Sequence, residues 1–208
     1  MDERATLIEG ARKLGLALTV EDAGRMLALL DELTRWNRAY NLTSIGQRAD
    51  MLTHHLLDSL SVHGEVTGTT LADVGTGAGF PGLPLAIVQP ARRFTLIDSS
   101  RKKIRFVAHA VRVLGLANVE PVHARVEEMS ERGPFDTVIA RAFAPLPRLL
   151  EAVEGLCGPE TRVLALKGPR AKEEIAGVRA PWRIVSQRPL EVPGLDEARH
   201  VIVMARSG

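Results

Sequence analysis

The sequence predicts an α/β protein: a doubly wound, mostly parallel sheet with an antiparallel closing strand and a helical N-terminal cap. Over residues 1–65, apolar residues recur at helical spacing. From residue 69 on, short apolar runs alternate with amphipathic helical segments, which is typical of a parallel sheet covered on both faces. The last two runs have no clear helix between them, so the final strand is expected to be antiparallel. We therefore expect a cap over residues 1–65 and one compact α/β unit over residues 66–208.

The predicted cap contains three helical segments. The first is the charged stretch MDERATLIEGARKLG. The second begins at Thr19, an N-cap with Asp22 three positions on, and its apolar face consists of Met26, Leu29, Leu30, Leu33 and Trp36. The third ends at Gly64 and carries Leu52, Leu56 and Leu60 on one face.

Polar residues of the cap are expected to have structural roles. Asn41, in NLTS, is predicted to cap the turn after the long helix rather than to touch a cofactor. His55 and Asp58 lie three apart on one helical face. We expect them to form a polar anchor between the cap and the sheet, and contact with RNA is the alternative.

The second part of the chain supplies the strands and their covering helices. One helix carries Ile104, Val107, Val111 and Leu114 and is closed by Gly115; another carries Leu146, Leu149, Leu150 and Val153 after two prolines. The run starting WRIVSQRPL is the partner of the last strand. The remaining predicted strands are TTLADVG (69–75), RRFTLIDSS (92–100), NVEPVHA (118–124), FDTVIARAF (135–143), TRVLALKG (161–168) and RHVIVMAR (199–206).

Composition places the chain among ordinary globular proteins of the cytoplasm. The chain has 208 residues, 45% of them hydrophobic and 25% charged, with a net charge of +2. No apolar stretch is long enough to span a bilayer, and the charged start lacks the apolar core of a signal peptide. A single cysteine, Cys157, excludes an internal disulfide framework. We expect a cytoplasmic protein, a monomer, with no membrane or DNA partner.

Four glycines and three prolines interrupt the apolar stretch LADVGTGAGFPGLPLAIVQP at 71–90. Asp73, Gly75, Gly77 and Gly79 form the pattern D-x-G-x-G-x-G where a strand meets a helix. Glycine permits positive φ and removes the Cβ that would keep a ligand away from the backbone. The backbone amides and the helix N-terminus then face whatever lies above the strand ends, so the pattern predicts a nucleotide-type ligand.

A carboxylate after the second strand supports this interpretation. Asp98 stands nineteen residues after Gly79, where an acidic side chain is placed to bind both hydroxyls of a ribose. The alternative is a helix cap formed by Asp98 with the serines that follow it. A carboxylate at Asp73 repels a pyrophosphate but suits an ammonium group, so the pattern favours S-adenosylmethionine over NAD.

These stretches resemble the class I methyltransferases, and most closely the 16S ribosomal RNA guanine-N7 methyltransferase family, also called glucose-inhibited division protein B. The glycine motif DVGTGAGFPGLPLAI carries the resemblance first. It continues over essentially the whole chain through RWNRAYNLTSI (35–45), HHLLDSL (54–60), DSSRKKIRFV (98–107), VEPVHARVEE (119–128), IARAFAPL (139–146), LALKGP (164–169) and EARHVIV (197–203).

The resemblance implies a Rossmann-like methyltransferase fold and transfer of a methyl group from S-adenosylmethionine to N7 of one guanosine in small-subunit rRNA. It places Gly75 and Phe80 against the cofactor at the first turn, Val126 and Glu127 beside the adenine, and Arg141 at the end of the fourth strand. The full set expected to bind the cofactor is Asp73, Gly75, Thr76, Gly77, Gly79, Phe80, Asp98, Val126, Glu127 and Arg141.

Guanine N7 has a free lone pair, so its methylation needs alignment and exclusion of water but no general base. Arg141 is the expected aligning group, clamping either the methionine carboxylate or the O6 edge of guanine. The alternative for Arg141 is an ion pair with Glu127 or Asp136. Cys157 resembles a buried thiol more than a nucleophile, and the histidines show no metal-ligand spacing.

The expected RNA contacts are basic residues near the strand ends. RKKIR at 101–105 begins a helix beside the cofactor rim, so Arg101, Lys102 and Lys103 either contact the rRNA backbone or form a solvated face. Lys167 either meets RNA phosphate or is an ordinary surface lysine. Arg199 and His200 begin the last strand and are expected by the substrate opening.

Two functions from other classes remain as alternatives. One is an NAD-dependent oxidoreductase, against which the early third glycine and Asp73 speak. The other is a non-catalytic RNA-binding protein with a methyltransferase fold, against which the intact glycines and Asp98 speak. The methyltransferase interpretation, which we favour, implies 16S rRNA within a small-subunit particle as the partner.

Overall fold

The structure, a computed structural model, describes residues 2–169 and 171–207. Its centre is a seven-stranded sheet in the order β3-β2-β1-β4-β5-β7-β6. The parallel strands are β1 (Thr70–Val74), β2 (Arg93–Asp98), β3 (Val119–His123), β4 (Phe135–Arg141) and β5 (Cys157–Lys167). β7 (Arg199–Arg206) runs antiparallel between β5 and β6 (Trp182–Leu190). The predicted fold class is confirmed.

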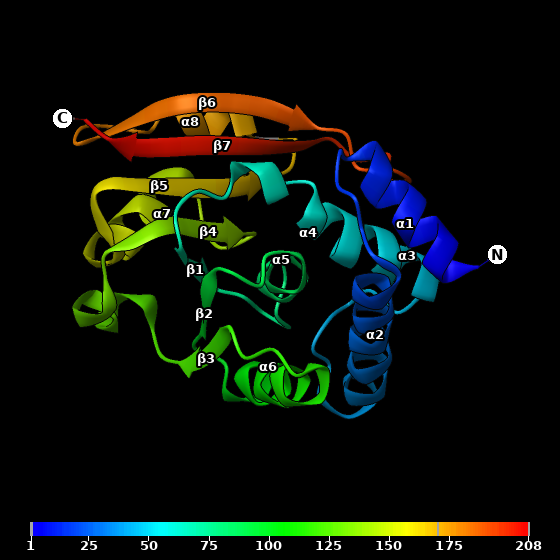
Figure 1. Ribbon diagram of the computed structural model, residues 1–208. Helices are drawn as coiled ribbons and strands as arrows, with labels where there is room; N and C mark the ends of the chain where they lie inside the picture. Colours follow the sequence, from blue (N-terminus) through cyan, green and yellow to red (C-terminus); the bar gives the residue numbers. More distant parts are fainter. Residues whose placement is uncertain (1, 170, 208) are drawn as a thin grey trace.

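Period-two alternation along the strands separates two cores, one on each face of the sheet. One face buries Leu71, Phe94 and Leu96 against α5 (Gly82–Val88), α6 (Arg101–Leu114) and the cap. The other buries Val74 and Val138 against α7 (Leu146–Val153) and against two 3-10 turns, η3 (Val126–Glu128) and η5 (Glu154–Leu156). A further 3-10 turn, η4 (Ser130–Arg132), precedes β4. Figure 1 shows β6, β7 and β5 stacked along the top of the view and the cap helices α1 (Glu3–Lys13), α2 (Val20–Tyr40) and α3 (Arg48–Met51) gathered at the right.

The cap consists of α1 (Glu3–Lys13), α2 (Val20–Tyr40) and a third, composite helix. Thr19 caps α2 and accepts a hydrogen bond from the backbone N–H of Asp22, as the sequence predicts. Asn41 ends α2 in the left-handed conformation, so its capping role is confirmed. The cap packs into the same core as α5 and the sheet, because Leu7, Met26 and other cap residues are fully buried in it.

The composite helix departs from the sequence prediction of one regular helix to Gly64. It begins as α3 (Arg48–Met51), passes through a π-helical segment, η1 (Leu52–Leu57), and ends as α4 (Asp58–Leu60). A 3-10 turn, η2 (His63–Glu65), follows and contains Gly64. The apolar spacing indicated a helix here but not the wider π turn, because both geometries place Leu52 and Leu56 on one side.

The remaining boundaries differ in detail. β5 starts at Cys157, before the predicted Thr161, because its first residue pairs with Phe135 across an irregular register. The short α8 (Ala171–Ile175) was not predicted. No helix among residues 2–169 and 171–207 is long and apolar enough to cross a membrane.

Candidate active site

The register of the sheet brings the carboxyl ends of β1, β2, β4 and β5 to one edge. Val74 pairs with Ile97 on one side and Ala140 on the other, so Asp98 and Arg141, each one residue further on, end the two strands that flank β1. Lys167 ends β5 and pairs with His200 at the start of the antiparallel β7. Residues predicted from four separate strands therefore share one edge, where parallel sheets bind ligands.

The glycine turn between β1 and α5 is left-handed at each of its three motif glycines. The φ angles are 67° at Gly75, 63° at Gly77 and 91° at Gly79, a region that L side chains rarely adopt. A Cβ at Gly75 would lie 2.6 Å from the ring of Phe143, and one at Gly79 would lie 2.3 Å from Leu83. At Gly77 a Cβ meets nothing closer than the Gly75 carbonyl oxygen at 4.0 Å. Gly77 is thus the point where open space reaches the backbone.

Asp73 lies beneath this turn and is fully buried, and its Oδ1 has no hydrogen-bond partner among the described residues. Contact with a ligand ammonium stays a prediction. Asp73 Oδ2 accepts hydrogen bonds from Thr76 Oγ1 at 2.6 Å and from the Gly82 N–H at 2.8 Å. Burial raises the pKa of Asp73 to about 6, although the bonds from Thr76 and Gly82 and the charge of Arg141 oppose the shift. The carboxylate joins the start of the turn to the start of α5, so it shapes the turn from below.

Asp98 is only 8% exposed and is held by backbone donors. Its Oδ2 accepts from the Gly77 N–H at 2.9 Å, and its Oδ1 accepts from the Ser100 N–H at 2.8 Å. The Lys103 ammonium is 4.0 Å from Oδ2. The N-cap of α6 is Ser100, and no side chain accepts a hydrogen bond there, so the bond from Ser100 N–H places Asp98 in the turn before the helix. Ribose binding by Asp98 stays a prediction. An ionised carboxylate has about four acceptor sites, which leaves lone pairs for a ligand.

Two adjoining hollows open over this edge. The first, the Asp98 cleft, has a volume of about 540 Å³ and is lined by Asp98, Ser99 and residues 124–127, which include Val126 and Glu127. The second, the cap cleft, has a volume of about 670 Å³ and lies between the glycine turn and the cap. Both are lined by Gly75, Lys103 and the loop 142–145, so they form two parts of one site.

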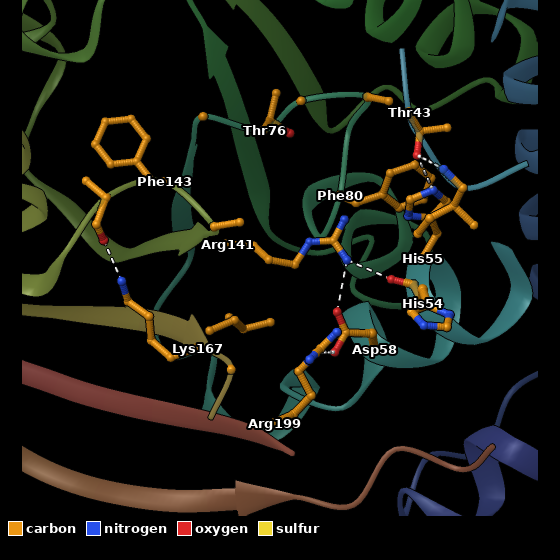
Figure 2. A pocket seen from close by; sticks show the side chains of 18 of the residues that line it. Thr43, His54, His55, Asp58, Thr76, Phe80, Arg141, Phe143, Lys167 and Arg199 are labelled. Atoms are coloured by element: carbon orange, nitrogen blue, oxygen red, sulfur yellow. Dashed lines mark hydrogen bonds and ion pairs between the residues drawn. The ribbon is translucent and has the colours of Figure 1, made fainter. Parts of the chain in front are cut away.

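Aromatic rings mark the cap cleft and its border with the Asp98 cleft (Figure 2). Phe143 lines both clefts, is 36% exposed and follows Ala142, whose φ of 52° is unusual for a residue with a side chain. Phe80 is buried and stacks on the His55 ring with centroids 4.5 Å apart. The Arg141 guanidinium carbon lies 5.8 Å from the centre of the Phe80 ring.

Arg141 pairs with Asp58 of the cap, which corrects the alternative that paired it with Glu127 or Asp136. Its Nη1 donates to Asp58 Oδ2 at 2.9 Å and to the His54 carbonyl oxygen at 2.8 Å. Arg199 Nε lies 3.5 Å from Asp58 Oδ1. Asp136 instead accepts from the backbone of Thr69 and Thr70, before β1 and at its start. The expected polar anchor between cap and sheet is therefore present at Asp58.

His55 completes the anchor as a neutral group. Its Nε2 lies 3.1 Å from Thr43 Oγ1, and burial, with the nearby charges of Arg141 and His54, lowers its pKa to about 3. The position of Thr43 is set by Asn37, whose side-chain oxygen accepts from the Leu42 and Thr43 N–H groups. His55 thus stays uncharged at neutral pH and supports Phe80 from behind.

The predicted RNA-binding residues divide into exposed and covered groups. Arg101 and Lys102 are exposed at the start of α6, where Lys102 donates to the Tyr40 carbonyl at 2.8 Å. The Lys167 side chain is only 11% exposed, pairs with Glu174 Oε2 at 2.7 Å and donates to the Ala144 carbonyl. Arg199 lines the cap cleft, whereas His200 lies beside it with a buried, unpartnered Nδ1.

Cys157 lies outside both clefts. It lies at the far end of β5, and burial raises its pKa to about 12, so the thiol is protonated at neutral pH. The part of the chain that the structure describes holds no cluster of three or more histidine, cysteine or acidic residues arranged to bind a metal ion.

Solved structures define the class of this fold. The O-methyltransferase TomG from Streptomyces achromogenes, solved with S-adenosylmethionine, is similar with a TM-score of 0.59 and 19% identity, covering 86% of this chain and 90% of that one. A SAM-dependent methyltransferase from Aquifex aeolicus is similar with a TM-score of 0.58 and 20% identity, covering 79% and 97%. The chain has the fold of class I methyltransferases.

Sequence comparison narrows the class to a family. The model of the GidB family, rRNA small subunit methyltransferase G, matches residues 22–202. Ribosomal RNA small subunit methyltransferase G of Pseudomonas paraeruginosa is 43% identical over 97% of this chain and 94% of its own length. The protein of the same description from an Escherichia coli O1:K1 strain is 43% identical over 91% and 92%. The chain belongs to the rRNA small subunit methyltransferase G family, which confirms the resemblance seen in the sequence.

Several site residues escaped the sequence interpretation. Phe143 lies in IARAFAPL (139–146), two residues after the end of β4, where an exposed aromatic residue could have been predicted to line the site. Thr43 and His54 line the cap cleft from the cap, and Glu174 lines it from α8, an element that the sequence did not predict. Their places depend on how the cap and α8 pack, which spacing alone does not give.

Proposed function

We propose that the chain is an S-adenosylmethionine-dependent methyltransferase acting on N7 of one guanosine in 16S rRNA. The observation that carries the proposal is the joined hollow at the strand ends, with Asp98 at one end, the bare turn at Gly77 between, and Arg141 at the other. Membership of the family supports the reaction, since relatives that match nearly the whole chain are named ribosomal RNA small subunit methyltransferase G.

The residues of the Asp98 cleft fit the proposed cofactor. Asp98 keeps free lone pairs for the ribose hydroxyls, and Gly77, which lines the adjoining cap cleft, leaves the space that a Cβ would fill. Val126 and Glu127 border the same cleft and would flank the adenine. When bound, S-adenosylmethionine supplies a methyl group made transferable by its sulfonium.

The cap cleft suits a nucleophile that needs no base. Its two described carboxylates are both paired with cations: Asp58 with Arg141 and Arg199, and Glu174 with Lys167. These ion pairs occupy acceptor positions of both carboxylates. Guanine N7 attacks with a free lone pair, so the residues act by holding the base in line and excluding water. Arg141 would align the reactants through its free nitrogens, and Phe143 offers a ring against which a base can stack.

We propose that RNA is held by cations around the mouth of this hollow. Arg101 and Lys102 are exposed beside Asp98 and Lys103, where phosphate contacts position a substrate without reading its sequence. Arg199 lies in the cap cleft and His200 beside it. Lys167 braces the loop 142–145 through the Ala144 carbonyl, so we assign it a supporting role in that loop.

The test is methylation of small-subunit particles from cells lacking this activity, using labelled S-adenosylmethionine, followed by mapping of the labelled nucleotide. The expected result is one methyl group on N7 of a single guanosine in 16S rRNA. Label on another atom, or none despite bound cofactor, would reject the reaction. Equilibrium dialysis against NAD and against S-adenosylmethionine distinguishes this proposal from the oxidoreductase alternative. An oxidoreductase would bind NAD and not S-adenosylmethionine.

A further inference from the structure

Asp58 reaches from the cap to the carboxyl edge of the sheet and meets two arginines there. Its side chain is 3% exposed, with Oδ2 on Arg141 at 2.9 Å and Oδ1 facing Arg199 at 3.5 Å. The two arginines come from the end of β4 and the start of β7, so one cap residue joins two strands (Figure 2). A carboxylate this deeply buried is stable as an anion only while it is paired.

The contacts of Asp58 fix which part of Arg141 is free. The guanidinium has five N–H donors, and the two of Nη1 are directed at Asp58 and at the His54 carbonyl. Figure 2 shows the other terminal nitrogen pointing away from Asp58, on the side where Phe80 lies. Nη2 and Nε therefore keep three donors for an acceptor in the cap cleft. Without Asp58 the guanidinium has no anion to select this orientation.

Asp58 also sets the charge of the cleft wall. Arg199 also pairs with Glu197 at 2.9 Å, so the two arginines and two carboxylates carry a net charge of about 0. Without Asp58 the group would carry about +1, and Arg141 would lose its carboxylate partner. Asp58 thus determines the direction of the Arg141 guanidinium and lowers the positive charge beside the cleft by about one unit.

The helix that carries Asp58 is locally adapted to this contact. The π-helical segment Leu52–Leu57 ends immediately before Asp58, whose N–H bonds to the Thr53 carbonyl five residues back. π segments widen a helix and change the direction of the side chains that follow, and they are frequent at functional sites. Here the segment presents the His54 carbonyl and the Asp58 carboxylate together to one nitrogen of Arg141.

From these contacts we infer that Asp58 is a positioning residue for the methyl transfer proposed above, on which this inference rests. Asp58 acts through Arg141. It holds the guanidinium at the carboxyl end of β4, so that Nη2 and Nε face the cap cleft. The cap is then part of the catalytic geometry as well as of the fold, since its anchor supplies the orientation of the aligning group.

The experiment is a double-mutant cycle of Asp58→Asn and Arg141→Gln, measured as kcat/KM for methylation of small-subunit particles. Misplacing the aligning group lowers kcat/KM by about 100-fold in each single variant. The double variant stays within about twofold of Arg141→Gln alone, because Asp58 has nothing left to position. A double variant that loses the product of the two effects overturns the inference.

Glu32→Gln is the matched control. Glu32 is another buried carboxylate of the cap, 11% exposed at its side chain, and pairs with His109 of α6 at 2.8 Å, away from both clefts. It is expected to lower the melting temperature and to leave kcat/KM unchanged. An equal loss of kcat/KM in Glu32→Gln would mean that Asp58 acts through cap stability alone.

A readout without turnover separates this inference from the proposed function. The Nε–H signal of Arg141 in ¹⁵N NMR, assigned by its absence in Arg141→Lys, reports the orientation of the guanidinium. Asp58→Asn is expected to shift or broaden this signal, whereas Asp58→Glu, which keeps the charge and serves if Asp58→Asn fails to fold, keeps the signal sharp. An unchanged signal in Asp58→Asn overturns the inference, whether or not the wild type methylates rRNA.

Discussion

Gly77→Ala tests whether a ligand approaches the backbone of the glycine turn. The φ of Gly77 is 63°, and an added Cβ meets no atom closer than 4.0 Å. The substitution therefore destabilises the folded protein only through the strain of a left-handed alanine, which costs about 1–2 kcal/mol. For a chain of this size that corresponds to a fall in melting temperature of about 2–8 °C. The Cβ projects into the hollow, where it would push the cofactor away.

The added methyl group should lower the affinity for S-adenosylmethionine, whereas the fold has room for it. Overfilling a packed contact by one methyl group costs about 1–3 kcal/mol. The Kd for S-adenosylmethionine should therefore rise about 5- to 150-fold. Isothermal titration calorimetry measures this affinity, and circular dichroism measures the melting temperature.

Gly115→Ala is the control for strain. Gly115 has a φ of 64° at the C-terminus of α6 and no atom within 4 Å of an added Cβ, so the two substitutions differ only in what faces them. Both variants should lose similar stability, while only Gly77→Ala loses affinity. Equal affinity for S-adenosylmethionine in the two variants would refute close approach at Gly77.

Three further predictions concern charge. Asp98→Asn should raise the Kd for S-adenosylmethionine about 10- to 150-fold in calorimetry, since it weakens charge-assisted bonds to the ribose. The His55 pKa of about 3 lies below the unfolded value of 6.5, so wild-type stability falls as the pH drops below 6.5. The advantage of wild type over His55→Gln in urea unfolding should shrink by about 2 kcal/mol between pH 7 and pH 5, and a constant difference would contradict neutral burial. Arg101→Ala and Lys102→Ala should each reduce the salt slope of RNA binding by about 1, while Lys167→Gln leaves the slope unchanged and lowers the melting temperature.

The edge of the sheet was predictable because parallel strands end together. The glycine pattern marked the end of β1, and Asp98 and Arg141 were each the first polar residue after an apolar run of a strand. Alternating strands and helices indicate that such residues share one edge, whatever the details of packing. The Asp98 carboxylate lies where this reasoning expects it, bound to the Gly77 N–H.

The depth and partners of individual side chains were not predictable in the same way. The sequence predicted that Asp73 contacts the ligand, whereas in the structure its Oδ2 accepts hydrogen bonds from Thr76 and Gly82 within the turn. Arg141 has several acids within reach along the chain, and its partner, Asp58, depends on the π turn of the cap. Lys167 was expected to be exposed because its partner, Glu174, could not be placed. Glu174 lies on α8, which is too short to give a periodic pattern in the sequence.

The distribution of acids around the hollow connects its structure to its chemistry. Asp73 is occupied by the turn, Asp58 by two arginines and Glu174 by a lysine. Asp98, which faces the hollow, accepts from two backbone N–H groups. The carboxylates therefore hold donors in place, and what they leave open to a substrate is N–H groups, a cationic wall and exposed aromatic surface. Such a surface attracts polyanionic RNA and an uncharged purine, and it has little to offer a nucleophile that must first lose a proton.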